Sequence, residues 1–127
     1  MALVSPAART VATATLVLAE LERPAKVHEA QDFYEADASH VLNRLRSLPD
    51  EVMSVLVVGH NPTTQILVQS LVDPDDADGA DRRDLIARRG FPTCALAVCC
   101  VDVASWRDVE RHSARLVGFF IPPYDRT

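Results

Sequence analysis

Short apolar runs alternate with longer stretches of helical periodicity along the first half of the chain, and this order constrains the fold more than any other feature of the sequence. The predicted strands and helices alternate over residues 2–4, 6–22, 27–33, 38–48, 53–58 and from 62 on. Alternation of this kind favours an α/β fold with a mostly parallel sheet between two layers of helices. In that architecture, loops that could carry chemistry lie at the carboxyl ends of the strands.

The second half of the chain has a different pattern. Residues 73–84 hold six aspartates among small residues, and we expect a solvated loop without regular structure, within an acidic and basic loop insertion over residues 73–90. Residues 93–103 and 116–121 predict two further strands that finish the chain like a β-hairpin. The whole of residues 1–127 is predicted to be a single domain.

Composition narrows the class of protein. The 127 residues are 48% hydrophobic and carry a formal net charge of −5, as in a folded domain that buries about two-thirds of its unfolded surface. The negative charge and the lack of a Lys/Arg cluster argue against nucleic acid as a partner. No apolar run approaches the ~18 residues of a membrane helix, and residues 1–10 lack the charged start of a signal peptide. We expect a cytoplasmic protein without a membrane partner.

Metal, thiol and serine chemistry have little support in the sequence. The three cysteines form no CxxC pair, and we expect them to be small buried hydrophobic residues of a reduced protein. The aspartate-rich segment departs from a calcium loop, because Pro74 and Leu85 stand where the first and last ligands should be. The chain has neither an HExxH nor a GxSxG motif. We predict neither a metal nor an organic cofactor.

Two junctions between a strand and a helix have the same design. Ser5 precedes Pro6 and Asn61 precedes Pro62, each pair directly after an apolar run or its short loop. Serine and asparagine are good N-caps, and proline suits the first helical position. If the strands are parallel, both helix N-termini open at one edge of the sheet, where free backbone N–H groups favour an anion.

Arg9 and His60 would flank that edge. An arginine fork matches phosphate oxygens, and a histidine supplies a second donor or a transferable proton near neutral pH. These residues predict a phosphate pocket. From spacing alone an alternative stays open, in which Ser5 and Asn61 are only caps, Arg9 lies on a solvated helix face, and His60 is hydrogen-bonded in its loop.

Four segments together carry a resemblance to a known family. They are SPAART at residues 5–10, FYEA at 33–36, SVLVVGHNP at 54–62 and FPTCALA at 91–97. In this order and at these separations they resemble the SixA-type phosphohistidine phosphatases of the histidine phosphatase, or phosphoglycerate mutase-like, superfamily. The resemblance runs from Leu3 to about Pro122.

The resemblance implies a three-layer α/β/α fold and a reaction in which the phosphoryl group passes to a histidine and then to water. Arg9 would bind phosphate, and His60 would stabilise the phosphoryl oxygens. Ser5 and Asn61 would support the loops, and Glu35 would either transfer a proton or be a surface carboxylate. The substrate would be phosphohistidine on a protein or another phosphomonoester, such as a phosphorylated small molecule.

The start of the chain departs from the family pattern. The family begins with a strand that ends in Arg-His-Gly or Arg-His-Ala, whose histidine is the nucleophile, followed by a helix, and this tripeptide is absent here. His112 follows an arginine but lies in a polar stretch, while His28 and His40 are expected to be surface histidines without partners. The missing strand belongs in the middle of the sheet, so we expect exposed sheet edges and apolar faces.

Two interpretations of this departure remain. In the first, the chain is an N-terminally incomplete phosphatase, lacking its first strand and helix and inactive in this form. In the second, it is a non-catalytic phosphate- or phosphoprotein-binding module on the same scaffold.

Overall fold

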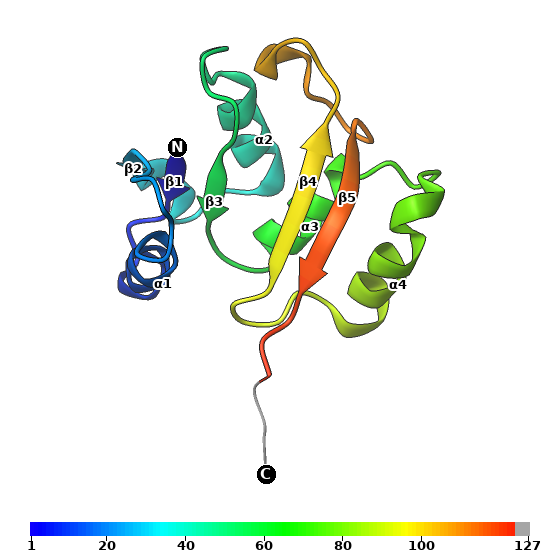
Figure 1. Cartoon of the computed structure of the whole chain (residues 1–127), viewed down its shortest axis with the longest axis horizontal. Coiled ribbons are helices and arrows are strands. Elements are labelled where there is room, and N and C mark those ends of the chain that lie inside the picture. The colour runs from blue at the N-terminus through cyan, green and yellow to red at the C-terminus, as the bar shows by residue number, and fades with distance from the viewer. Residues whose placement is uncertain (124–127) are drawn as a thin grey trace.

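The computed structural model describes residues 1–123, which form two sheets lying side by side (Figure 1). The strands β1 (Ala2–Val4), β2 (Val27–Glu29) and β3 (Leu56–Val58) make a parallel sheet in the order β2-β1-β3. The strands β4 (Leu96–Val101) and β5 (Ala114–Phe120) make an antiparallel pair. The predicted α/β class is confirmed, with most of the described strands parallel.

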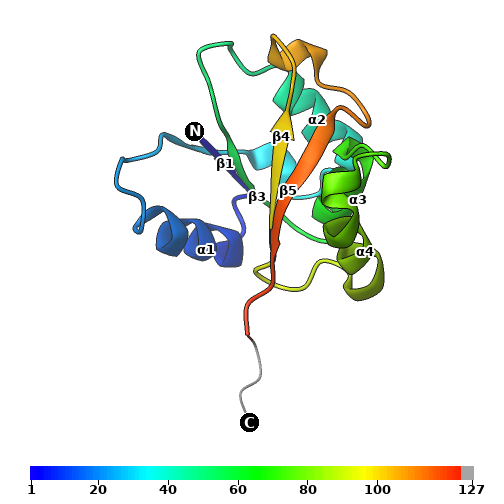
Figure 2. The same cartoon turned by 45° about the vertical axis from the view of Figure 1, so that its right-hand side comes forward.

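Helices lie on both sides of the strands. They are α1 (Ala8–Leu18), α2 (Ala38–Arg46), α3 (Thr63–Leu71) and α4 (Ala80–Arg89), with single 3-10 turns at Gln31–Phe33, Ala77–Gly79 and Trp106–Asp108. Figure 2 shows α1 on one side of the sheets, with α2, α3 and α4 on the other. The arrangement is the predicted three-layer one. Within the described residues, no helix combines the length and the apolar character that a bilayer span requires.

The strand β1 is the centre of the parallel sheet and is buried along its whole length. Ala2 and Val4 pack with Ala14 of α1, while Leu3 joins the cluster that contains Val41 of α2 and residues of α3. Successive side chains of a strand point to opposite faces, so a strand covered on both faces reads as an unbroken apolar run. This explains why Ala2–Val4 carries no polar residue.

The register of the sheet brings two chain segments together at one edge. Ala2 of β1 is opposite Leu56 of β3, and Val4 is opposite Val58. Just beyond the strands, the Ser5 amide donates to the Val58 carbonyl over 3.0 Å. The predicted meeting of the two strand-to-helix junctions is therefore confirmed.

The hairpin of β4 and β5 is covered on one face only. Cys99 and Ala97 pack toward the core around Leu116, whereas Leu96, Val98 and Phe120 keep 44%, 40% and 59% of their surface exposed. The three exposed residues lie near one end of the hairpin, because Leu96 is opposite Phe120 and Val98 is opposite Gly118. We call Leu96, Val98 and Phe120 the outer hairpin face.

The facing edges of β3 and β4 have no ladder partner within the described part of the chain. The two strands lie next to each other in both views (Figures 1 and 2). One core cluster runs beneath both, since it includes Val57 of β3 and Cys99 and Val101 of β4. Side-chain packing, without backbone pairing between β3 and β4, joins the two sheets.

The segment predicted as a loop over residues 73–84 is in part a helix. The helix α4 begins at Ala80 and buries Ile86 to 2% exposure. An Asp84–Arg88 pair at helical spacing lies on its exposed side, and Gly90 follows its end with φ of 69°, the left-handed region that glycine tolerates. The prediction was wrong because it relied on the many aspartates of the segment. It gave too little weight to the two signals for a helix, the apolar Ile86 and the glycine at position 90.

Two smaller predictions also fail. The strand β3 is only half-buried and begins at Leu56, with Met53 89% exposed, because its outer edge is unpaired. Cys94 and Cys100 are exposed, while Cys99 is partly buried. The alternation of β4 turns Cys100 outward while Cys99 faces the core, and burial raises the pKa of the Cys99 thiol to about 11.

Candidate functional site

His60 is contacted by two side chains from the segment that follows β1. Its Nε2 lies 2.7 Å from the Ser5 Oγ, and its Nδ1 lies 3.0 Å from Nη2 of Arg9. Ser5 follows β1, Arg9 is in the first turn of α1, and His60 follows β3. Because β1 and β3 are parallel, residues more than 50 positions apart meet at one sheet edge.

The hydrogen bonds fix which nitrogen of His60 carries the proton. Arginine can only donate, so Nδ1 must accept from Arg9. In a neutral ring the other nitrogen then carries the hydrogen, and Nε2–H donates to the Ser5 oxygen. Partial burial, and then the charge of Arg9, lower the pKa of His60 below its ordinary value of 6.5. Near neutral pH His60 is a neutral imidazole.

Ser5 is fully buried and its backbone is held on both sides. Its amide donates to Val58, and its carbonyl accepts from the Thr10 Oγ1 over 2.7 Å. The prediction that Ser5 caps the helix is wrong, because α1 begins at Ala8 with Ala7 at the cap position and no side-chain cap. Ser5 lies too early in the chain, and its hydroxyl is engaged with His60.

Arg9 brings a positive charge to the beginning of a helix. No acidic side chain lies in the first turn of α1, and no carboxylate pairs with Arg9 in the described part of the chain. A helix N-terminus carries partial positive charge, so a cation there is unfavourable unless an anion is nearby. Arg9 is exposed, as the alternative interpretation expected, and its guanidinium is also hydrogen-bonded to His60.

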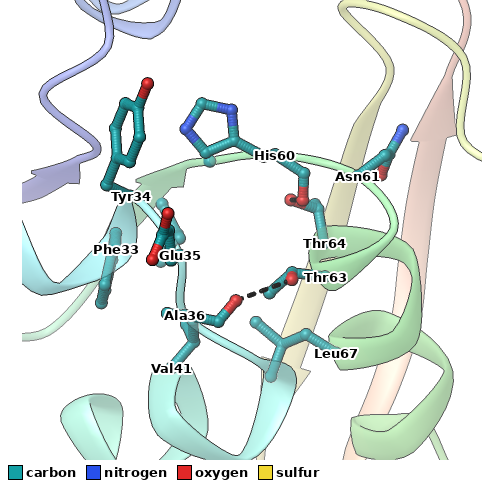
Figure 3. A pocket seen from close by; sticks show the side chains of 12 residues that line it. Phe33, Tyr34, Glu35, Ala36, Val41, His60, Asn61, Thr63, Thr64 and Leu67 are labelled. Carbon is teal, nitrogen blue, oxygen red and sulfur yellow. Dashed lines mark hydrogen bonds between the residues drawn. The ribbon is translucent and has the colours of Figure 1, made fainter.

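A cavity of about 230 Å³ opens beside His60 (Figure 3). It lies between the loop before α2 and the beginning of α3, and Thr63 bridges the two by donating to the Ala36 carbonyl over 2.8 Å. Its walls are mostly apolar, with a few hydroxyl, amide and carboxylate groups. They comprise Phe33, Tyr34, Glu35, Ala36, Val41, Val57, Gly59, His60, Asn61, Thr63, Thr64 and Leu67. Arg9 and Ser5 do not line the cavity. His60 therefore borders the cavity and also contacts Ser5 and Arg9 outside it.

Glu35 and Tyr34 border this cavity across from α3 (Figure 3). The Tyr34 ring meets the His60 ring edge-on, with centroids 6.2 Å apart and planes at 71°. Glu35 is exposed, and among the described residues it alone brings a carboxylate to the wall of this cavity. The structure thus brings Glu35 to the same hollow as His60, without a direct bond between them.

Asn61 borders the cavity (Figure 3), and its amide donates to the Phe91 carbonyl. The prediction that Asn61 caps the third helix is wrong. The helix α3 begins at Thr63 with Pro62 at the cap position and no side-chain cap. Asn61 instead ties the loop after β3 to the segment before β4, which Gln65 also holds by accepting from the Phe91 amide over 3.1 Å.

The other three histidines lie outside this cluster. His40 is bonded to Asp32 at 2.5 Å, so the expectation of a partnerless surface residue is wrong for it. The Nε2 of His28 is buried without a partner in the described region, and His112 is exposed with its amide bonded to Ser70. Among the described residues, the side-chain contacts of His60 are with Ser5, Arg9 and Tyr34, and with none of these three histidines.

Sequence reasoning assigned no role to Tyr34 or Asp37 at this site. Asp37 caps α2 by accepting from the His40 amide over 2.8 Å, and its position three residues ahead of that amide was a usable signal. The Tyr34 contact with His60 had no such signal, because it joins two loops. Within residues 1–123, no group of three or more His, Cys, Asp or Glu side chains could hold a metal ion.

The chain resembles several known proteins, although no family model matches it. Uncharacterized protein Rv1276c of Mycobacterium tuberculosis is 36% identical over 113 residues, which cover 89% of this chain and 68% of that protein. Uncharacterized protein ML1117 of Mycobacterium leprae is 33% identical over 108 residues, covering 85% of this chain and 63% of that protein. The solved "Putative Phosphohistidine Phosphatase SixA" from Nakamurella multipartitia is similar in structure, with a TM-score of 0.76 and 25% identity, over 96% of this chain and 70% of that one.

Proposed function

Because this chain belongs to the family of the mycobacterial protein Rv1276c and has a histidine-phosphatase-like fold, we propose that it is a phosphatase domain. Its substrate would be phosphohistidine or another phosphomonoester, and its reaction would pass through a phosphohistidine intermediate. Arg9 and His60 would hold the phosphoryl oxygens, with Ser5 and Asn61 supporting them.

The observation that carries this proposal is the contact of Arg9 with His60 at the carboxyl ends of β1 and β3. Arg9 lies at a helix N-terminus with no acidic residue in the first turn, so an anion there gains both the guanidinium and the helix dipole. A dianion bound between Arg9 and His60 would balance the positive charge of the Arg9 guanidinium, which in the free protein is hydrogen-bonded to a neutral imidazole.

The reaction needs a nucleophile in line with the phosphorus. Both ring nitrogens of His60 are engaged, so we propose that the nucleophilic histidine comes from a segment outside these 127 residues. The unpaired edges of β3 and β4 would take that segment as an added strand. Its histidine would form an N–P bond as the P–O bond of an ester, or the P–N bond of phosphohistidine, breaks. Water would then attack the phosphorus and break the new N–P bond, releasing phosphate.

Glu35 would serve as the proton donor to the departing group, the ester oxygen or the imidazole nitrogen of phosphohistidine. It lines the cavity that His60 borders, so its carboxyl group would lie beside a substrate held at His60. Without the added segment, the 127-residue chain would bind phosphate but would not hydrolyse an ester.

The alternative is a non-catalytic phosphate-binding module. It is favoured by the engagement of both His60 nitrogens and by the distance of the other histidines from the cluster in the described part of the chain. Both functions predict anion binding, and only the first predicts turnover.

Hydrolysis of an aryl phosphate separates the two functions. The assay compares the 127-residue chain with a version extended by the in-frame sequence that precedes Met1. Activity in the extended version alone, abolished when an Arg-His histidine of the extension is replaced by alanine, supports the phosphatase. Phosphate binding without turnover in both versions supports the module, and the absence of both binding and turnover overturns both functions.

A further inference from the structure

Ser5, which follows β1, is fully buried and is hydrogen-bonded through both its backbone and its side chain. The side chain is buried to 0% exposure, its backbone is bonded to Val58 and Thr10, and its hydroxyl oxygen is 2.7 Å from the His60 Nε2. A hydroxyl held this firmly can fix the orientation of a histidine ring, in the way that an outer partner fixes a ligating or catalytic ring. The tautomer follows from Arg9, which can only donate to Nδ1.

The other ring nitrogen is in a different situation. The Nδ1 of His60 accepts from Arg9, which is exposed and carried on a flexible side chain. An anion oxygen arriving beside Nδ1 would meet a lone pair and be repelled unless that nitrogen acquires a proton. The guanidinium can turn toward the anion, since His60 is its single side-chain partner among residues 1–123.

Resting on the proposed phosphate site, we propose that Ser5 is a positioning residue that holds the His60 ring with Nε2 toward its own hydroxyl and Nδ1 toward the anion, and that anion binding protonates His60 at Nδ1. The Arg9 N–H leaves Nδ1 for an anion oxygen, and one proton from solvent adds to Nδ1. The new Nδ1–H then donates to the anion, while Nε2–H stays on Ser5. Anion binding and formation of the imidazolium are thus a single coupled event.

The charges around His60 support this coupling. In the free protein, burial and Arg9 keep the pKa of His60 low. An anion adds negative charge beside the ring and offsets the charge of Arg9, so it raises that pKa. The other titratable groups that face His60 are Tyr34, whose ring meets it edge-on, and Glu35, which shares its cavity.

The resting tautomer is tested first by ¹⁵N NMR of the histidine rings in the anion-free protein, with His60 assigned by comparison with His60→Gln. We expect the Nε2–H tautomer, neutral near neutral pH. A predominant Nδ1–H tautomer, or an imidazolium without any anion, would overturn the proposal. This measurement needs neither turnover nor an anion, so it is independent of the proposed function.

The coupling is tested by titrating with sulfate, which stays a dianion throughout the range in which histidine titrates. Calorimetry in two buffers of different ionisation enthalpy should show net proton uptake approaching one proton, and NMR should show both His60 nitrogens protonated. Sulfate binding at Arg9 without proton uptake overturns the coupling and leaves the phosphate site standing. Failure of both sulfate and inorganic phosphate to bind overturns the phosphate site itself.

Ser5→Ala tests the positioning role. It should weaken sulfate binding about two- to tenfold, the range expected for one lost hydrogen bond. It should also lower the proton uptake on sulfate binding, because Nε2–H of the imidazolium loses its acceptor. Ser5→Thr, which keeps the hydroxyl, should restore both the affinity and the proton uptake. Thr13→Ala is the matched control, because it removes a hydroxyl that bonds the Arg9 carbonyl without touching His60. A Ser5→Ala variant that folds and binds sulfate with unchanged affinity and unchanged proton uptake would overturn the positioning role.

Discussion

At the scale of single residues, His60 has two contacts of opposite character. Ser5 is buried and fixed, whereas Arg9 is exposed and charged. The first contact sets the orientation of the ring, and the second sets its charge in the absence of an anion. A neutral ring beside a cation is an arrangement that an incoming anion can convert into two cationic donors.

Replacing Arg9 by alanine should weaken phosphate binding by about 1.5 to 3 kcal/mol, the usual contribution of a charge-assisted contact. Isothermal calorimetry with inorganic phosphate measures the difference. Arg88→Ala is the matched control, because Arg88 pairs with Asp84 on the exposed side of α4 and should leave the affinity unchanged. An equal affinity for Arg9→Ala and the unaltered protein would remove Arg9 from the site.

His60 should also contribute to the pH dependence of folding. Its pKa is lower in the folded protein than the ordinary 6.5, so the unfolded chain binds more protons between the two values. The free energy of unfolding should therefore fall as the pH drops below about 6.5, and His60→Gln should lose this part of the slope. Urea unfolding of both proteins across this pH range measures it, and parallel slopes would contradict the shift.

At the scale of elements, the sequence predicted best where both faces of an element are covered or where the periodicity is clear. The strand β1 is an unbroken apolar run because helices cover both of its faces, and parallel pairing then brought Ser5, Arg9 and His60 together as expected. The partner of Asn61 could not be predicted, because its amide reaches a carbonyl 30 residues away. The local sequence predicted that Asn61 caps the following helix, but its side chain instead makes the tertiary hydrogen bond to Phe91.

The helix α4 provides a test of the corrected assignment. Ile86 is 2% exposed and packs in a cluster with Leu116, so Ile86→Ala should destabilise the protein by about 2 to 5 kcal/mol. Chemical denaturation measures the change. Ala87→Ser, at the exposed neighbouring position, should cost far less. A loss for Ile86→Ala no larger than that for Ala87→Ser would mean that this segment is the solvated loop first predicted.

At the scale of the whole molecule, two sheets share one core while their facing edges stay unpaired in the described residues. Unpaired edges and apolar faces are sites where other chains can add. The outer hairpin face of Leu96, Val98 and Phe120 lies on the half of the molecule that contains such an edge. The expectation of exposed edges and apolar faces, which the family resemblance suggested, agrees with this arrangement.

The 127-residue chain should therefore self-associate as its concentration rises. Val98→Lys places a charge on the outer hairpin face and should reduce this association with little change in melting temperature. Sedimentation velocity measures the association. Leu16→Lys on α1, where the leucine is 72% exposed but lies away from the hairpin, is the matched control. Equal effects of the two substitutions would show that the hairpin face has no special role.

The most direct test of the account is a crystal structure of the chain soaked in tungstate, a phosphate mimic whose metal can be located by anomalous scattering. The account predicts a tungstate between the Arg9 guanidinium and the His60 ring, with the Ser5–His60 contact kept. A tungstate bound only at other arginines, such as those of α4, with the Arg9–His60 contact unchanged, would contradict it.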